Sequence, residues 1–163
     1  MLRFMLDTNI CIYVIKNRPP SCREKFTTHS GALAISSVSM AELIYGAMKS
    51  AKPESNLRTV EEFAARLTVL DFDTHAAGHY GDIRSNLEAK GTVIGPYDMM
   101  IAGHARSHGL IHVNNNTREF ERVVGYCLEK WGERSEESRG GKESRAQVER
   151  WNGNKKDSDE KKT

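Results

Sequence analysis

Short apolar runs alternate along this chain with longer stretches of helical periodicity, and this alternation constrains the fold more than any other feature. The apolar runs of strand length are residues 2–6, 33–37, 67–72, 110–113 and 126–130. The stretches with helical spacing are residues 9–16, 20–26, 39–49, 54–67, 74–90 and 97–108. Strands joined by helical crossovers form mainly parallel sheets that are covered on both faces. We therefore predict an α/β fold with a mainly parallel five-stranded sheet flanked by helices.

The composition changes abruptly near Trp131. Before this residue apolar runs alternate with polar turns, whereas residues 132–163 are dense in Glu, Arg, Lys, Ser and Gly. Such a segment buries too little apolar surface to offset the entropy of ordering it. We therefore expect one folded domain over residues 1–131 and a charged, disordered tail over residues 132–163. Because the tail contains several lysines, an alternative to a plain solvated segment is that the tail binds RNA weakly.

Cysteine usage and hydropathy indicate the compartment. Cys11, Cys22 and Cys127 are widely spaced and include no CxxC pair, which predicts a reducing cytoplasm rather than a disulfide framework. No segment reaches the roughly 20 apolar residues of a membrane span, so we expect no membrane association. The formal net charge is only +2, so local charge arrangement must provide any attraction for nucleic acid.

Three acids stand at the predicted starts of helices. Asp7 follows the first strand, and Glu42 and Asp98 lie in the first turns of later helices. Ligand sites in open parallel sheets form outside the carboxyl ends of the strands, so these acids are expected to converge there. Converging carboxylates repel one another unless a hard cation lies between them, and oxygen ligands suit Mg²⁺ or Mn²⁺. Such an ion is what phosphodiester hydrolysis requires.

Each of these acids also has a structural explanation. Asp7 is suited to cap the first helix, and Glu42 stands three residues after Ser39, the spacing of a capping box. Asp98 follows Pro96 and suits a helix N-terminus through the helix dipole. Periodicity alone does not choose between these explanations and a metal site.

The sequence around the acids favours the metal site. Residues 5–9 read MLDTN, residues 35–46 read ISSVSMAELIYG, residues 94–102 read IGPYDMMIA and residues 113–122 read VNNNTREFER. These four segments, in this order, resemble the four motifs of the PIN domain family. Their residues are similar to those of the VapC toxins of VapBC toxin–antitoxin modules. The resemblance spans residues 1 to about 131.

The resemblance implies a PIN-like three-layer fold and a type II toxin that acts as an Mg²⁺-dependent endoribonuclease on structured RNA. The branch that it resembles most acts on the anticodon stem-loop of initiator tRNA. The family pattern makes Asp7, Glu42 and Asp98 the metal ligands, with Mg²⁺ or Mn²⁺ as cofactor. It also implies a VapB-type antitoxin as partner and a homodimer as the assembly.

The fourth motif departs from the wider family pattern. Asn116 stands where many relatives have Asp, and Asn114 replaces the usual Thr. Asn116 is our first choice for the fourth catalytic position, and Glu119 is a nearby carboxylate that would substitute for it. Thr8 and Asn9 are expected to support Asp7 through hydrogen bonds.

Several further residues are weaker candidates. Arg and Lys grip RNA backbones, and a tyrosine beside an active-site acid would stack on a base, although a core role is as plausible. Apolar residues of the early helices would line an antitoxin groove, although for each a plain core role is favoured. The candidates for phosphate contacts are Arg84, Lys90, Arg106, Arg118 and Arg122. The candidate for base stacking is Tyr97. The candidates for the antitoxin groove are Ile12, Tyr13, Leu43 and Ile44.

Three alternatives remain. Two pairs of histidines have i, i+4 spacing, but neither has the Glu of HExxH, which disfavours zinc. Another Mg²⁺-dependent α/β phosphohydrolase would require a second acid after the first strand, where residues 7–9 read DTN. A catalytically weak, RNA-binding PIN-like module is the other rival, because the fourth acid is missing.

Overall fold

A computed structural model describes residues 1–132 of the chain, so the expectation of a disordered tail falls outside the described residues. The strands are β1 (Phe4–Leu6), β2 (Leu33–Ser36), β3 (Thr68–Leu70), β4 (Ile111–Asn114) and β5 (Leu128–Lys130). The helices are α1 (Thr8–Lys16), α2 (Pro20–Thr28), α3 (Ser37–Lys49), α4 (Pro53–Ala64), α5 (Thr74–Ala89), α6 (Pro96–Ser107) and α7 (Thr117–Phe120). No helix within residues 1–132 is long and apolar enough to cross a membrane.

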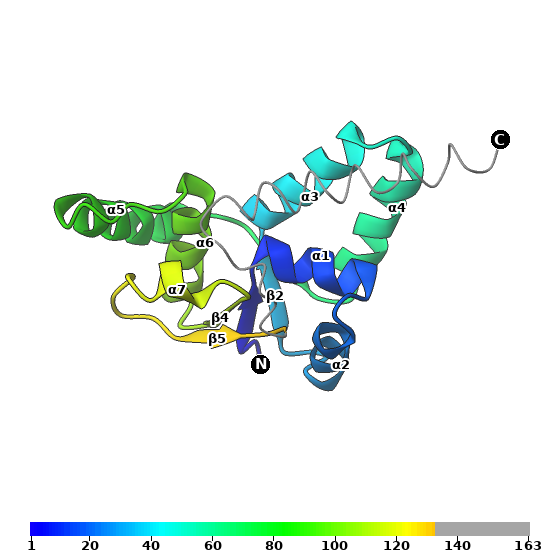
Figure 1. The fold of residues 1–163 in the computed structure, drawn as a ribbon, viewed down its shortest axis with the longest axis horizontal. Coiled ribbons are helices and arrows are strands. Elements are labelled where there is room, and N and C mark those ends of the chain that lie inside the picture. Colours follow the sequence, from blue (N-terminus) through cyan, green and yellow to red (C-terminus); the bar gives the residue numbers. More distant parts are fainter. Residues whose placement is uncertain (133–163) are drawn as a thin grey trace.

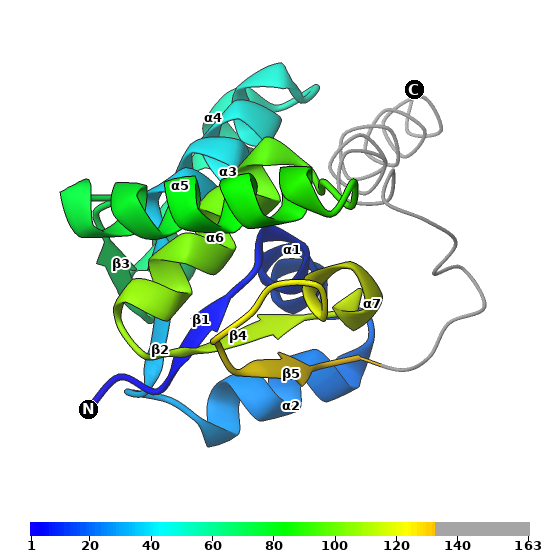
Figure 2. The ribbon, with the colours of Figure 1, turned by 90° about the vertical axis from the view of Figure 1, so that its left-hand side faces the viewer.

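The five strands form one sheet in the order β3-β2-β1-β4-β5, and every neighbouring pair is parallel. In Figure 2, α5 and α6 lie on one side of the sheet and α2 lies on the other. The predicted architecture is therefore confirmed. Because β1 and β4 pair in the centre, their carboxyl ends meet at one edge of the sheet.

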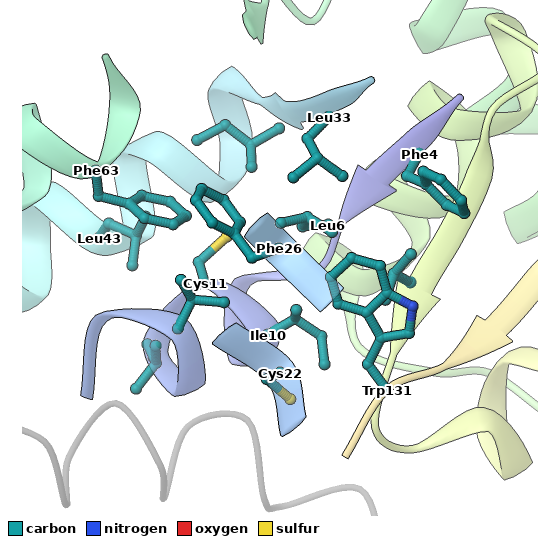
Figure 3. Close-up of a cluster of buried hydrophobic side chains, with 14 of the residues drawn as sticks. Phe4, Leu6, Ile10, Cys11, Cys22, Phe26, Leu33, Leu43, Phe63 and Trp131 are labelled. Atoms are coloured by element: carbon teal, nitrogen blue, oxygen red, sulfur yellow. The ribbon is translucent and has the colours of Figure 1, made fainter. Parts of the chain in front are cut away.

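Alternating residues of the central strands supply two separate cores. Phe4 and Leu6 of β1 join a cluster built mainly from α1, α2, α3 and α4 (Figures 1 and 3). Met5, between them, packs instead with Ile101 and Ala105 of α6. A strand buried on both faces needs such a continuous apolar run, which is why residues 4–6 are all apolar.

Helices α5 and α6 pack at an unusually short distance at Gly103. A Cβ added there would lie 2.8 Å from the backbone nitrogen of Tyr80 and 3.1 Å from its Cα. Backbone atoms of a packed helix cannot move aside as the end of a flexible side chain can. Glycine at this position therefore allows α5 to pack against α6, whose first turn contains Asp98.

We expect Gly103→Ala to lower the free energy of unfolding by about 1–3 kcal/mol, because the added methyl group overpacks the contact with Tyr80. Gly81→Ala, in exposed α5 backbone with nothing within 4 Å of the added Cβ, is the matched control. It should stabilise the helix by about 0.5–1 kcal/mol. Urea unfolding of both variants measures the difference, and a neutral Gly103→Ala would contradict the close contact.

Two differences between the local predictions and the structure concern the start of α3 and the presence of α7. Ser37, assigned to the second strand from the sequence, is the first residue of α3, because the Ser36 side chain accepts a hydrogen bond from the Val38 N–H and caps the helix. Helix α7 was not predicted, since four residues are too few to show helical periodicity. Neither difference moves a predicted site residue away from the carboxyl edge of the sheet.

Candidate active site

The predicted site residues gather at the carboxyl edge of the sheet. Asp7 directly follows β1, and Glu42 lies in α3, which follows β2 without a loop. Asp98 is in the first turn of α6, which begins at Pro96 as expected from the sequence. Asn116 occupies the position before α7, just after β4. Segments that are far apart in the chain thus bring these four residues to the same edge of the sheet.

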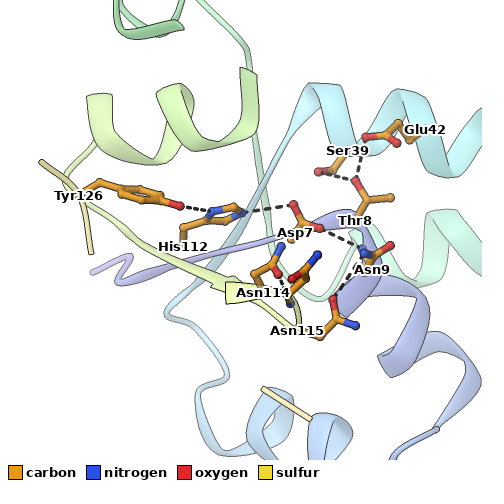
Figure 4. A network of polar contacts seen from close by, with 10 residues as sticks. Asp7, Thr8, Asn9, Ser39, Glu42, His112, Asn114, Asn115 and Tyr126 are labelled. Carbon is orange, nitrogen blue, oxygen red and sulfur yellow. Dashed lines mark hydrogen bonds and ion pairs between the residues drawn. The ribbon is translucent and has the colours of Figure 1, made fainter. Parts of the chain in front are cut away.

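Asp7 is almost completely buried, with 1 % of its surface exposed. Its Oδ2 accepts a hydrogen bond from the Asn9 N–H at 3.4 Å, so Asp7 does cap α1. Its Oδ1 lies 3.3 Å from Nε2 of His112, a buried residue of β4 (Figure 4). The capping role is therefore real, and it also holds the carboxylate at the edge of the sheet.

Glu42 is held by a hydroxyl group. Thr8 Oγ1 lies 3.0 Å from Glu42 Oε1, which accepts its hydrogen, and 3.1 Å from Ser39 Oγ (Figure 4). The capping box expected between Ser39 and Glu42 is wrong, because Ser36 caps α3 and Ser39 lies inside the helix. The sequence predicts that Thr8 supports Asp7, whereas its hydroxyl contacts Glu42 and Ser39 in the structure.

The electrostatics show that the acids lie close together. Burial and then the negative charges of Asp7, Glu42 and Glu119 raise the pKa of Asp98 to about 8. Burial, Asp7 and Glu42 also raise the pKa of the Cys11 thiol well above its ordinary value. A carboxyl group holds its proton to such a pH only where other negative charges and a low dielectric oppose ionisation.

The residues after β4 form a second group of polar contacts. The Asn116 backbone N–H donates to Oδ1 of Asn114, which shapes the turn into α7. Asn115 donates from Nδ2 to the Tyr13 hydroxyl at 2.6 Å and accepts from Asn9 Nδ2 at 3.5 Å. Asn9 thus ties α1 to the fourth motif. Of the two candidates for the fourth position, Glu119 is the one whose charge acts on Asp98.

The donor set has the chemistry that Mg²⁺ or Mn²⁺ requires, since it consists of carboxylate and amide oxygens with excess negative charge. Oδ1 of Asn9 is buried here and has no hydrogen-bond partner among the described residues. As the side chains stand, no three His, Cys, Asp or Glu residues within 1–132 are arranged to hold one ion. The charge and the donor type therefore fit a divalent cation, although Glu42 is turned toward Thr8.

The candidates for RNA contacts differ in whether their side chains already have partners. Arg84 pairs with Glu88, and Arg106 with Asp82, so both guanidinium groups are already engaged. Tyr97 is 53 % exposed and lies outside the core. The other basic candidates, Lys90, Arg118 and Arg122, are exposed.

The candidates for the antitoxin groove differ in burial, and two of the histidines considered for zinc have other partners. Ile12 and Leu43 belong to the core, whereas Tyr13 and Ile44 are half-buried. In the histidine pairs, Nδ1 of His104 lies 2.8 Å from the Ser36 hydroxyl, and Nδ1 of His79 accepts from Arg106 at 2.7 Å.

Sequence reasoning missed His112 and Tyr126. His112 lies between two apolar residues in a strand that is buried on both faces, and this polar interruption was the available signal. Its Nδ1 lies 3.3 Å from the Tyr126 hydroxyl, so the contact with Asp7 extends to a residue just before β5 (Figure 4). A histidine at such a position must find partners for both ring nitrogens, because burial without them is costly.

Comparison with known proteins finds a family and relatives that match most of the chain. The model of the PIN domain family matches residues 4–126. The chain is 60 % identical over 131 residues to the tRNA(fMet)-specific endonuclease VapC of Shigella flexneri, covering 80 % of this chain and 99 % of that protein. It is 50 % identical, again over 80 % of this chain and 99 % of the relative, to ribonuclease VapC2 of Haemophilus influenzae. The crystal structure of DNA-bound VapBC from Salmonella typhimurium has a similar chain, with 57 % identity and a TM-score of 0.78, covering 81 % of this chain and 100 % of that one.

Proposed function

Because the chain belongs to the PIN domain family, we propose that it is a metal-dependent endoribonuclease and the toxin of a type II toxin–antitoxin pair. The observation that supports this most is the meeting of Asp7, Glu42, Asp98 and Glu119 at one sheet edge, where burial and then the negative charges of the other three acids raise the pKa of Asp98 to about 8. A structural protein gains nothing from such repulsion, whereas a nuclease uses it to bind a cation.

The substrate that we propose is initiator tRNA, cleaved in the anticodon stem-loop. Support comes from the 60 % identity to a tRNA(fMet)-specific endonuclease over nearly the whole of that relative. We propose that Arg118 and Arg122, which are exposed within the fourth motif, contact the RNA backbone. Tyr97, exposed next to Asp98, is placed to stack on an unpaired base.

We assign Asp7, Glu42 and Asp98 as the ligands of Mg²⁺ or Mn²⁺, with Asn116 or Glu119 at the fourth position. When bound, the cation would activate water and neutralise negative charge that develops on the phosphodiester. Thr8 restrains Glu42, and the Asn9 N–H restrains Asp7 at the end of β1. The nearly complete burial of Asp7 keeps bulk water away from its carboxylate. Since water attacks, the products should carry 5′-phosphate and 3′-hydroxyl ends.

The partner that we propose is a VapB-type antitoxin, since the similar solved structures include VapBC complexes from three bacteria. Tyr13 and Ile44 remain candidates for its groove, whereas the burial of Ile12 and Leu43 assigns them to the core. A homodimer and a cytoplasmic location complete the proposal. We also propose that residues 1–131 fold as one domain without the tail.

Cleavage of total tRNA with purified protein, in Mg²⁺ and in EDTA, tests the function. We expect cleavage in Mg²⁺ only, and sequencing of the RNA ends should show one dominant cut in initiator tRNA with 5′-phosphate termini. Products ending in 2′,3′-cyclic phosphate would reject metal-assisted hydrolysis. Tight tRNA binding without any cleavage would instead support the RNA-binding module.

A further inference from the structure

A buried chain of hydrogen bonds approaches Asp7 from the side opposite α1. His112 is fully buried in β4, where its backbone pairs with Met5 of β1. Nε2 of the ring lies 3.3 Å from Asp7 Oδ1, and Nδ1 lies 3.3 Å from the Tyr126 hydroxyl (Figure 4). The Phe120 ring packs against the imidazole in a T-shaped pair, with 4.7 Å between the centroids, which restricts rotation of the imidazole. Both ring nitrogens and the ring orientation are therefore determined by neighbours.

The chemistry of the partners determines the direction of these bonds. An ionised carboxylate only accepts, so Nε2 of His112 carries the hydrogen that faces Asp7. In the neutral ring Nδ1 then has a lone pair, which accepts the hydrogen of the Tyr126 hydroxyl. Burial and the negative charges of Asp7 and Asp98 raise the pKa of Tyr126, so its hydroxyl remains protonated and able to donate. The hydrogen bonds run from Tyr126 through His112 to Asp7.

We propose that His112 and Tyr126 are positioning residues that hold Asp7 in the orientation for metal binding, a role that rests on the proposed nuclease function. Carboxylates that bind metals are themselves held by hydrogen bonds from outside the metal site, and losing such a bond lowers metal affinity. The bond from His112 restrains Oδ1, while the Asn9 N–H restrains Oδ2. Each oxygen has about two lone-pair directions, so both keep capacity for a cation.

A set of four variants tests this role through Mn²⁺ affinity, measured as free Mn²⁺ by electron paramagnetic resonance. His112→Leu removes the donor and should weaken Mn²⁺ binding by about 10–100-fold. His112→Gln keeps an N–H at the end of its side chain and should restore most of the affinity. Tyr126→Phe removes only the hydroxyl and should weaken binding by about tenfold, the lower end of that range.

Tyr80→Phe is the matched control. Tyr80 packs against the same cluster as Tyr126, but its hydroxyl bonds to Arg84 on the exposed face of α5. This variant should bind Mn²⁺ like the unchanged protein. Nitrogen-15 NMR of the imidazoles gives a second readout that is independent of any misfolding of His112→Leu. We expect the Nε2–H tautomer for His112 in the unchanged protein and a shifted Nδ1 resonance in Tyr126→Phe.

The outcomes separate this proposal from the proposed function. Equal Mn²⁺ affinity of His112→Leu and the unchanged protein, with tRNA cleavage retained, would overturn the positioning role and leave the nuclease assignment intact. The predicted order of Mn²⁺ affinities in a protein that cleaves no RNA would support the positioning role and overturn the nuclease assignment. An Nδ1–H tautomer of His112 would also overturn the positioning role.

Discussion

Replacing Asp98 with asparagine should lower kcat/KM for tRNA cleavage by about 10³-fold and, without metal, make the protein more resistant to unfolding at pH 8. The loss follows because a metal ligand contributes several kcal/mol of transition-state stabilisation, and each 1.36 kcal/mol is a factor of ten in rate. The stabilisation follows because asparagine removes a charge that is opposed first by burial and then by Asp7, Glu42 and Glu119. Initial-rate kinetics and thermal unfolding in EDTA measure the two effects.

The pH dependence has a definite sign. The pKa of Asp98 is about 8 in the folded protein, against about 3.9 for an unperturbed aspartate, so the folded state binds this proton more tightly than the unfolded chain does. The stability that this proton contributes is complete below pH 4 and is lost as the pH rises to 8. In EDTA, the unfolding temperature of the unchanged protein should therefore fall relative to that of Asp98→Asn across this range.

The control is Glu61→Gln, which removes an exposed acid of α4 outside the site. It should alter neither the cleavage rate nor the dependence of stability on pH. Retained cleavage by Asp98→Asn would remove Asp98 from the metal site. A metal-free Asp98→Asn protein that is less stable than the unchanged one at pH 8 would contradict the repulsion among the four acids.

Trp131→Ala should lower the free energy of unfolding by about 3–5 kcal/mol, the largest effect on stability that we expect from one substitution. Trp131 is fully buried, and its ring lies 6.0 Å from that of Phe4 and 5.8 Å from that of His29, between centroids. Its backbone N–H also donates to the Asn114 carbonyl at the end of β4. Figure 3 shows the indole beside Phe4 and Ile10, where truncation would leave a large cavity. Urea unfolding measures the change.

Truncation after Gly132 is the companion experiment, and it tests the proposed domain boundary. The shortened protein keeps Trp131 and should unfold at the same urea concentration as the full chain. A large loss of stability on truncation would show that residues 133–163 contribute to the fold. A cost below about 1 kcal/mol for Trp131→Ala would contradict the packing of the indole in the core.

The fold was predictable because its elements have distinct periodicities. Apolar runs such as residues 2–6 and 110–113 match buried parallel strands, and the stretches between them have helical spacing. Helix boundaries were less predictable, since capping depends on which oxygen faces the first free N–H groups. The sequence suggested Ser39 through its capping-box spacing to Glu42, whereas in the structure the Ser36 side chain caps α3.

The site was predictable in part. The motif residues Asp7, Glu42 and Asp98 were expected to meet, and the structure places all three at one edge with mutual electrostatic influence. The alternation of strands and helices could be read from the residues alone, and parallel pairing brings the acids that follow the strands to one edge of the sheet. The contacts of His112 with Asp7 and of Thr8 with Glu42 arise only in the folded chain. Hydrogen bonds between segments as much as 105 residues apart depend on strand order, register and side-chain rotamers, which no local pattern encodes.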